Sequence, residues 1–315
     1  MLLKQLGVVM PKAIGIDVGG TNLRLGVFED MQLLQEIRFQ ADFSLICKQN
    51  DPEVAWQTII ETTAKGIQNV LAQYPDVQHI GIGFPGFIDP RTNTIAKSPN
   101  FPGLIDVNLA HDLSKKLNKT VVVENDANAA AYGEYCLAGK PEGGLVYLGL
   151  GTGVGGGLIL QGKPYVGQHG CAMEAGHIIV EHNGRLCGCG NQGCMEQYAS
   201  ATGVSVSYYN ATQKQHTAAE IAQLAKAGDI NAIQAYEVAA KALAQALASI
   251  LKVADVENVV IGGGMVGAWD LMQSAFHQRL NQDLIPVLRG KVTVTTSTVR
   301  DIAGMLGVAM LATMS

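Results

Sequence analysis

A strand–turn–strand pattern occurs twice in this sequence and limits the folds that the chain can adopt. Residues 14–28, IGIDVGGTNLRLGVF, can be laid over residues 146–160, VYLGLGTGVGGGLIL, with Gly19 aligned to Gly151. Each copy reads as a short strand, a glycine turn that contains a threonine, and a second strand. A hairpin at the head of each half predicts two similar α/β domains that face one another, although ordinary hairpin chemistry also produces repeats this short.

Strands and helices alternate along the rest of both halves. We expect further strands at residues 79–84, 120–123, 257–261 and 292–295. We expect helices at residues 52–74, 127–138, 218–227, 231–253 and 301–314, and one more between Gly264 and Leu280. Residues 83–103 are rich in Pro, Gly and Asn and are expected to form a loop. Strands interleaved with helices indicate layered α/β domains.

The composition argues against several classes of protein. Of the 315 residues, 48% are hydrophobic and 16% are charged, which suits a large buried core. The net charge is −5 and no basic run occurs, so we expect no binding to nucleic acid. Residues 143–162 carry no charge, but nine of them are Gly, which favours a hairpin over a membrane helix. Because the N-terminus also makes a poor signal peptide, we expect a cytoplasmic protein that binds no membrane.

Three glycine loops stand at the ends of predicted strands. The first is DVGGTN, and the others lie at residues 149–157 and 262–264. Gly lacks a Cβ, so backbone N–H groups can approach phosphate oxygens, and Asp17 is suited to hold a phosphate-bound Mg²⁺. A type I′ turn is the ordinary alternative for a single loop of this kind. Three such loops in one α/β chain favour nucleotide binding, although none matches a Walker or Rossmann motif.

Three of the cysteines lie within eight residues, in the segment CGCGNQGC. A disulfide between Cys187 and Cys189 would be strained because one residue separates them, and cytoplasmic thiols stay reduced. With Cys194 and a nearby histidine, His177 rather than His169 or His182 on spacing, these residues match the Cys₃His set of a closed structural zinc site. An iron–sulfur cluster would need a fourth cysteine from further away, and scattered buried thiols are the simplest alternative.

Asn125 and Asp126 stand between the predicted strand VVVE and an Ala-rich helix. A carboxylate in this position could accept a proton from a substrate hydroxyl as phosphoryl transfer begins. The simpler interpretation is an N-cap, because Asp and Asn are ordinary at the start of a helix. The two roles are compatible, since the carboxyl end of a strand faces the usual ligand crevice.

Six motifs, in this order along the chain, resemble the ROK family of sugar kinases and repressors: DVGGTNLRLGVF, GFPGFID, VENDANAAAYGE, LGLGTGVGGGL, EAGHI and CGCGNQGCMEQ. The resemblance runs from Ile14 to the last predicted helix. It implies an actin/hexokinase-like (ribonuclease H-like) α/β fold with two domains and a ligand cleft between them. The smaller domain would comprise residues 1–125 plus 300–315, and the larger one residues 126–299 with the zinc-binding loop.

The resemblance also implies a role for each residue of the motifs. Asp126 looks like the general base for the sugar hydroxyl. The sugar-binding set is expected to comprise Gly86, Asn100, Asn125, Asp126, Glu174, His177 and Glu196. The contacts to ATP and Mg²⁺ are expected at Asp17, Gly20, Thr21, Asn22, Thr152, Gly153, Gly263 and Gly264. The zinc ligands are expected to be His177, Cys187, Cys189 and Cys194, so that His177 both binds zinc and touches sugar.

The resemblance leaves kinase and repressor to be distinguished. Repressors of the family carry a helix-turn-helix region ahead of the first glycine loop, and a first strand near residue 12 leaves no room for one. The compact segment from Glu174 to Cys187 resembles the glucokinases and predicts an ATP-dependent kinase of glycolysis that phosphorylates the 6-hydroxyl of glucose. The alternatives are an N-acetylglucosamine or N-acetylmannosamine kinase, a fructokinase, and then a non-catalytic sugar-sensing regulator. Nothing in the loops excludes polyphosphate as donor, and the family analogy favours a homodimer or homotetramer.

Overall fold

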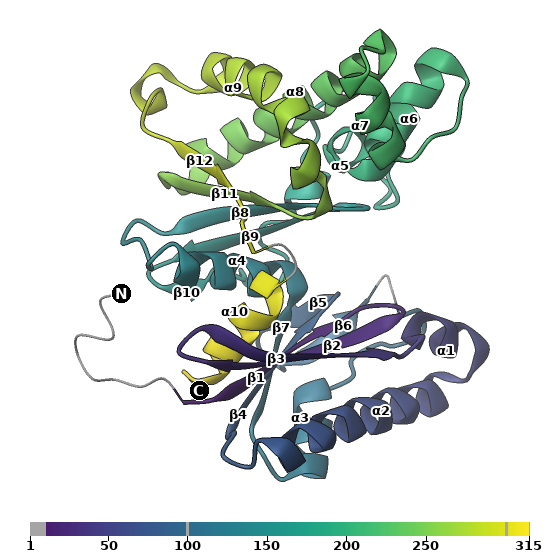
Figure 1. The fold of residues 1–315 in the computed structure, drawn as a ribbon, viewed down its shortest axis with the longest axis vertical. Helices are drawn as coiled ribbons and strands as arrows, with labels where there is room; N and C mark the ends of the chain where they lie inside the picture. The colour runs from purple at the N-terminus through teal and green to yellow at the C-terminus, as the bar shows by residue number, and fades with distance from the viewer. Residues whose placement is uncertain (1–10, 99–100, 300–301, 315) are drawn as a thin grey trace. The chain divides into compact units, whose positions relative to one another are not determined.

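The computed structural model describes residues 11–98, 101–299 and 302–314 of the chain (Figure 1). Within them, the contacts divide the chain into two compact units. The first is drawn from residues 1–140, 163–172 and 301–315, and the second from residues 141–162 and 173–300. The sequence placed the first boundary at residue 125, whereas this division keeps residues 126–140 and 163–172 with the first unit.

The first unit is built on a five-stranded sheet of order β3-β2-β1-β4-β7. The β1–β2 and β2–β3 pairs are antiparallel, whereas β1–β4 and β4–β7 are parallel. The strands are β1 (Ala13–Val18), β2 (Asn22–Glu29), β3 (Gln32–Gln40), β4 (His79–Phe84) and β7 (Val121–Asn125), and a separate two-stranded ribbon comprises β5 (Phe87–Asp89) and β6 (Thr94–Lys97). The parallel strands place the ends of β1, β4 and β7 at one edge of the sheet.

Alternation along the strands gives this sheet two different faces. Ile14 and Ile16 belong to an apolar core formed with the three helices α1 (Phe43–Gln49), α2 (Pro52–Gln73) and α3 (Leu109–Leu117). Gly15 lies between them on the opposite face, where a Cβ would collide with the carbonyl oxygen of Met305. The glycine therefore permits α10 (Ile302–Ala312) to lie directly on β1.

The helix α4 (Asp126–Leu137) packs against α10 at equally short range. A Cβ on Gly133 would strike the Ala303 carbonyl, and one on Gly307 would strike the Ala129 carbonyl. Because two helices can approach this closely only through small residues, these glycines attach α4 to the first unit.

The second unit repeats the strand connections of the first. Its strands follow the order β9-β8-β11-β12, in which β8–β9 is an antiparallel hairpin and β8–β11 and β11–β12 are parallel. The strands are β8 (Leu145–Leu150), β9 (Val154–Leu160), β11 (Asn258–Gly262) and β12 (Thr293–Thr296). The two-residue strand β10 (Lys163–Pro164) follows β9 in the chain. The repeated hairpin predicted from the sequence is confirmed.

Helices of the second unit pack against its sheet. The long helix α8 (Ile230–Ala254) buries Leu243 and Leu247 against strand residues such as Leu148 and Ile261. The remaining elements are α5 (Glu196–Ala199), α6 (Ala201–Thr212), α7 (Ala218–Lys226) and α9 (Trp269–Asp283), with the short 3₁₀ helices η2 (Ala175–His177), η3 (Gly264–Ala268) and η4 (Pro286–Leu288). Among the described residues, no helix combines the length and the apolar character that crossing a membrane requires.

The secondary structure expected from the sequence is largely confirmed, and the additions are local. Residues 83–103 were expected to be a loop, but they contain the ribbon β5–β6. The sequence also gave no expectation for β3, α1, α3, α5 and α6. These elements are mostly short or only partly buried, so their apolar periodicity is weak.

Candidate functional site

The turn from β7 into α4 separates the two roles that the sequence left open. Asn125 is the N-cap, because its Oδ1 accepts hydrogen bonds from the N–H groups of Ala127 at 2.9 Å and Asn128 at 3.1 Å. Asp126 is the first residue of α4; its Oδ1 accepts from the Ala127 N–H at 2.9 Å and its side chain is exposed. The capping requirement is met by Asn125, so the Asp126 carboxylate is available for another purpose.

The surroundings of this turn raise the pKa of the Asp126 carboxyl. Although the side chain reaches solvent, the many protein atoms around it disfavour the charged form, which is the largest cause, and hydrogen bonds from backbone N–H groups oppose this effect. Asn125 is tied to the loop after β4, because its Nδ2 donates to the carbonyl of Gly86 at 3.2 Å. The structure thus brings Asp126, Asn125 and Gly86 together, while Asn100 lies outside the described residues.

Glu124 lies behind this turn and was not singled out in the sequence. Its Oε1 accepts from the Asn125 N–H at 2.8 Å and from Asn128 Nδ2 at 3.2 Å. Burial raises the pKa of its carboxyl. The only sequence signal was its position in the strand VVVEN, where an acid interrupts an apolar run.

The first glycine loop (residues 19–21) joins β1 to β2 at the same edge of the sheet. In the parallel register, Asp17 is paired with Gly83 and Gly83 with Glu124, so Asp17 and Glu124 lie at the same level of the sheet, on strands that β4 separates. Gly20 carries no side chain, and Thr21 and Asn22 are exposed, with Asn22 Nδ2 donating to Thr21 Oγ1 at 3.1 Å. Arg24 on β2 lies 3.9 Å from Asp17, measured from Nη1 to Oδ2.

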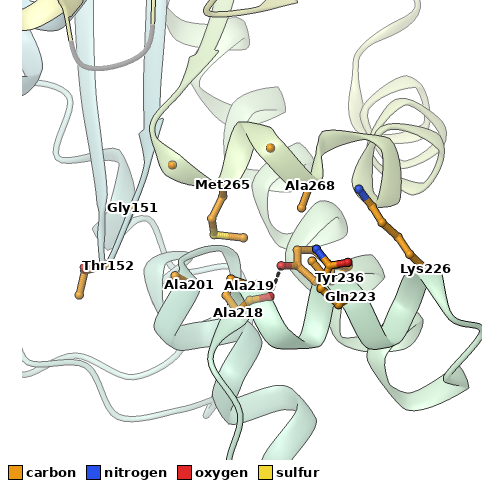
Figure 2. Close-up of a pocket in the computed structure, with 13 residues that line it drawn as sticks. Gly151, Thr152, Ala201, Ala218, Ala219, Gln223, Lys226, Tyr236, Met265 and Ala268 are labelled. Atoms are coloured by element: carbon orange, nitrogen blue, oxygen red, sulfur yellow. Dashed lines mark hydrogen bonds between the residues drawn. The ribbon is translucent and has the colours of Figure 1, made fainter.

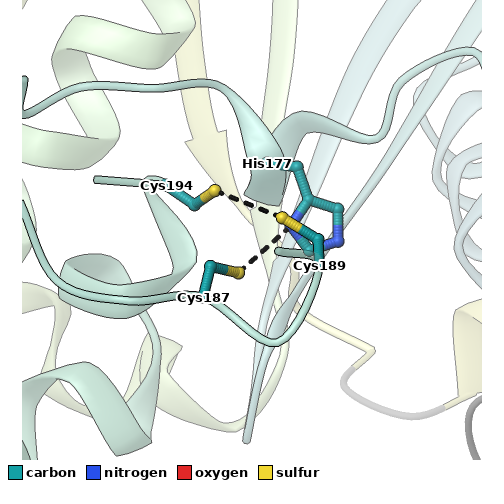
Figure 3. Close-up of side chains that lie close together, drawn as sticks. All are labelled: His177, Cys187, Cys189 and Cys194. Carbon is teal, nitrogen blue, oxygen red and sulfur yellow. Dashed lines mark hydrogen bonds between the residues drawn. The ribbon is translucent and has the colours of Figure 1, made fainter. Parts of the chain in front are cut away.

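Four potential metal ligands converge in the second unit (Figure 3). Cys187, Cys189 and Cys194 come from the cysteine loop (residues 178–195), and His177 ends η2 just before it. Their ligand atoms all lie within 4.8 Å of one another. Cys187 Sγ is 3.6 Å from His177 Nδ1, and Cys189 Sγ is 3.6 Å from Cys194 Sγ.

The two separations of 3.6 Å fit a tetrahedral zinc ion. Zn–S bonds of about 2.3 Å and a Zn–N bond of about 2.0 Å require S–S separations near 3.8 Å and S–N separations near 3.5 Å. Glu174 Oε2 lies 3.8 Å from the other ring nitrogen of His177, the usual outer partner of a metal-binding histidine. Burial raises the pKa of Cys194 to about 12, and a bound cation would counter that shift by favouring the thiolate.

Glu196 is the first residue of α5 and lies directly after the cysteine loop. Its Oε2 accepts from the N–H of Val154 at 2.9 Å, and a Cβ on Gly153 would collide with the same carboxylate. Glu174 and His177 thus precede the cysteine loop in the chain, and Glu196 follows it. The second unit also joins Glu196 to the second glycine loop (residues 151–153).

A pocket of about 500 Å³ opens beside the second and third glycine loops (Figure 2). Thr152 and Lys226 lie at its opposite ends, and Met265 faces the alanines of the helix starts across it. Gly263, in the third glycine loop (residues 262–264), has φ +84°. A Cβ on Gly263 would collide with the carbonyl oxygen of Leu150, so this loop lies against the end of β8. The loops at the ends of β8 and β11 thus form one wall of the pocket.

The helices that line the pocket were missing from the sequence-based site. Lys226 on α7 forms an ion pair with Asp270 at 3.3 Å, from Nζ to Oδ2. Tyr236 on α8 donates its hydroxyl to the Ala218 carbonyl at 2.7 Å, and burial raises its pKa to about 12. No local motif marks these residues, because packing of α7 and α8 against the glycine loops is what brings them there.

The model of the ROK family matches residues 13–315. The chain belongs to the ROK family. As a ROK protein it is similar to the glucokinase of Thermotoga maritima, at 33% identity over 95% of this chain and 96% of that one. It is also similar to the N-acetyl-D-glucosamine kinase of Salmonella newport, at 32% identity over 94% of this chain and 98% of that one.

A solved ROK structure supports the fold. The ROK family glucokinase from Streptomyces griseus, determined in complex with glucose and AMPPNP, is 29% identical. It matches with a TM-score of 0.75, over 96% of this chain and 100% of that one. The actin/hexokinase-like fold class expected from the sequence is therefore confirmed for this ROK protein.

Proposed function

We propose that this ROK protein is an ATP-dependent hexose kinase that phosphorylates the 6-hydroxyl of glucose, with Asp126 as the general base. The observation that carries the proposal is the β7–α4 turn. Asn125 caps the helix there, which leaves Asp126 exposed at the sheet edge that also holds the first glycine loop. A carboxylate beside a phosphate-type loop suits a kinase, in which a base accepts the proton of the attacking hydroxyl.

The roles of the other residues follow from the motifs. Asp126 takes the proton of the sugar hydroxyl as that oxygen bonds to the γ-phosphorus, and ADP leaves. We assign sugar binding to Gly86, Asn100, Asn125, Glu174, His177 and Glu196, and contacts to nucleotide to Gly20, Thr21, Asn22, Thr152, Gly153, Gly263 and Gly264. Mg²⁺, when bound, neutralises phosphate charge, and Asp17 is its candidate ligand.

The pocket of Figure 2 is the proposed place of the adenosine. Its volume of about 500 Å³ is within the usual range for ligand sites. Its walls are mostly apolar side chains and glycine, which suits a flat purine ring. The proposed zinc is structural, because three cysteines and His177 occupy all four positions of a tetrahedron.

The choice of sugar rests on the relatives. Similarity to the Thermotoga glucokinase favours glucose, and the similarity to an N-acetyl-D-glucosamine kinase makes N-acetylhexosamines the second candidate. The short segment from Glu174 to Cys187, which resembles that of the glucokinases, also favours glucose.

The substrate proposal is tested by ADP release with glucose, mannose, fructose, N-acetylglucosamine and N-acetylmannosamine. We expect the highest kcat/KM with glucose. A higher value with an N-acetylhexosamine would replace glucose as the substrate, and no turnover with any sugar would contradict the kinase proposal. In the same assay, Asp126→Asn should lower kcat by at least about 10²-fold while sugar still binds, because a positioned base contributes about 10²–10⁴ in rate.

A further inference from the structure

The cysteine loop is attached to the helices after it by one arginine. Arg185 donates from Nη1 to the carbonyls of Gln197 at 2.6 Å and Gly203 at 3.0 Å, and from Nη2 to Ser207 Oγ at 2.9 Å. Its guanidinium lies 4.4 Å from the centroid of the Tyr198 ring. One side chain therefore bridges the loop to both α5 and α6, through neutral acceptors.

A second contact joins the cysteine loop to the α5–α6 corner, which comprises residues 196–207 of these two helices. Gln197 Nε2 lies 3.6 Å from Cys187 Sγ, so α5 contacts a proposed zinc ligand directly. The N–H of Arg185 also donates to the Tyr198 hydroxyl at 2.9 Å. The cysteine loop and the α5–α6 corner are thus held together by several bonds at once.

The α5–α6 corner in turn holds the second glycine loop. The N–H of Ala201 donates to the Gly151 carbonyl at 2.9 Å, and Thr202 Oγ1 donates to the Thr152 carbonyl at 3.0 Å. Both acceptors lie in the loop that lines the pocket of Figure 2. Hydrogen bonds therefore connect the cysteine loop to the backbone of residues 197–207, and that backbone to the wall of the pocket.

We propose that Arg185 is a positioning residue for the nucleotide: it fixes the α5–α6 corner, and the corner fixes the Gly151–Thr152 backbone that nucleotide contacts. This rests on the proposed function, because it assumes that the pocket takes a nucleotide. It adds that the cysteine loop supports nucleotide binding, besides positioning the proposed sugar-binding residues beside it. A purely structural Arg185 would affect unfolding alone and leave the affinity of the folded protein unchanged.

The test measures the dissociation constant of an Mg²⁺-bound, non-hydrolysable ATP analogue by calorimetry, without sugar, for the wild type and Arg185→Met. Met keeps a long stem over Tyr198 but removes every guanidinium donor. We expect binding to weaken about three- to thirtyfold, the usual range for mutations along a coupling network. The KM for ATP should rise accordingly, while kcat at saturating ATP changes little.

The matched control is Arg289→Met. Arg289 also donates to backbone carbonyls, those of Leu284 at 3.0 Å and Gln282 at 3.4 Å, but it touches neither the corner nor the pocket lining. Its removal should leave the dissociation constant unchanged. Metal content and the melting temperature, measured for each variant, separate loss of metal or of folding from loss of positioning.

A second variant keeps the proposal testable if Arg185→Met does not fold. Thr202→Val breaks the hydrogen bond to the Thr152 carbonyl and should also weaken nucleotide binding. The double variant should raise the dissociation constant by less than the product of the two separate fold-changes, because both substitutions interrupt the same path. Unchanged nucleotide affinity in both Arg185→Met and Thr202→Val would overturn the inference, whereas absence of nucleotide binding by the wild type would overturn the proposed function itself.

Discussion

Asn125 and Asp126 are adjacent residues of one turn, but their side chains serve different purposes. Sequence alone offered an N-cap and a catalytic base for the same pair. The hydrogen bonds assign the cap to Asn125, whereas the Asp126 carboxylate accepts from the Ala127 N–H and its side chain is exposed. Glu124 holds the Asn125 N–H from behind, so the turn is fixed on both sides.

The pH dependence of turnover tests the role of Asp126. Its pKa is raised above the ordinary value of about 3.9, and a base works only when ionised. We therefore expect kcat to reach its plateau above the raised pKa and to fall about tenfold per pH unit below it, with a midpoint above the ordinary pKa of an aspartate.

Glu124→Gln is the control for this pH profile, because the pKa of Glu124 is also raised and Gln keeps an oxygen that accepts from the Asn125 N–H. The acid limb should persist in this variant, with folding checked by circular dichroism across the range. If the fall of kcat at low pH is absent from Glu124→Gln, the titration belongs to Glu124, contrary to our expectation.

At the scale of elements, close contact between helices α4 and α10 defines the first unit. Glycines at the crossing allow the backbones to touch, and that contact keeps α4, with Asp126 at its start, on this unit. A residue with a side chain would have to push the helices apart.

Two glycines of α10 make this packing testable by opposite effects on stability. Gly307→Ala places a methyl against the Ala129 carbonyl and should destabilise the protein by about 1–3 kcal/mol. Gly304→Ala meets nothing within 4 Å and should stabilise it by about 0.5–1 kcal/mol, because Ala favours a helix. Urea unfolding of both variants measures the two changes; equal effects would contradict the close contact.

At the scale of the whole molecule, two units with the same strand connections carry different additions. The first has Asp126, the proposed base, and a glycine loop, whereas the second has the cysteine loop and the pocket. A repeated hairpin thus supports two sets of residues with separate cores.

Metal removal should affect the two units unequally. We expect about one zinc per chain by elemental analysis, and chelation should speed hydrogen exchange in residues 177–194 while β1 and β4 stay protected. Cys189→Ser should reproduce the effect, and Cys171→Ser, another exposed cysteine outside the cluster, should not. Fully active protein without metal would contradict the zinc proposal.

Local signals predicted the framework well. Alternation gave the strands of both hairpins, and the Ala-rich run gave α4, because each depends on neighbours in sequence. The cysteine cluster was also visible, since its three thiols lie within eight residues. The roles of Lys226, Tyr236 and Arg185 could not be predicted from the sequence, because their contacts depend on how the helices pack.

The α/β class, the repeated hairpin, the glycine loops and the Cys₃His set could all be predicted from the amino-acid sequence, since periodicity and spacing are properties of the chain. Three features required the folded structure: Asn125 is the cap, α7 and α8 complete the pocket, and Arg185 connects the cysteine loop to Thr152 through α6. Capping, pocket walls and hydrogen bonds depend on distances in space, which packing fixes and sequence separation does not.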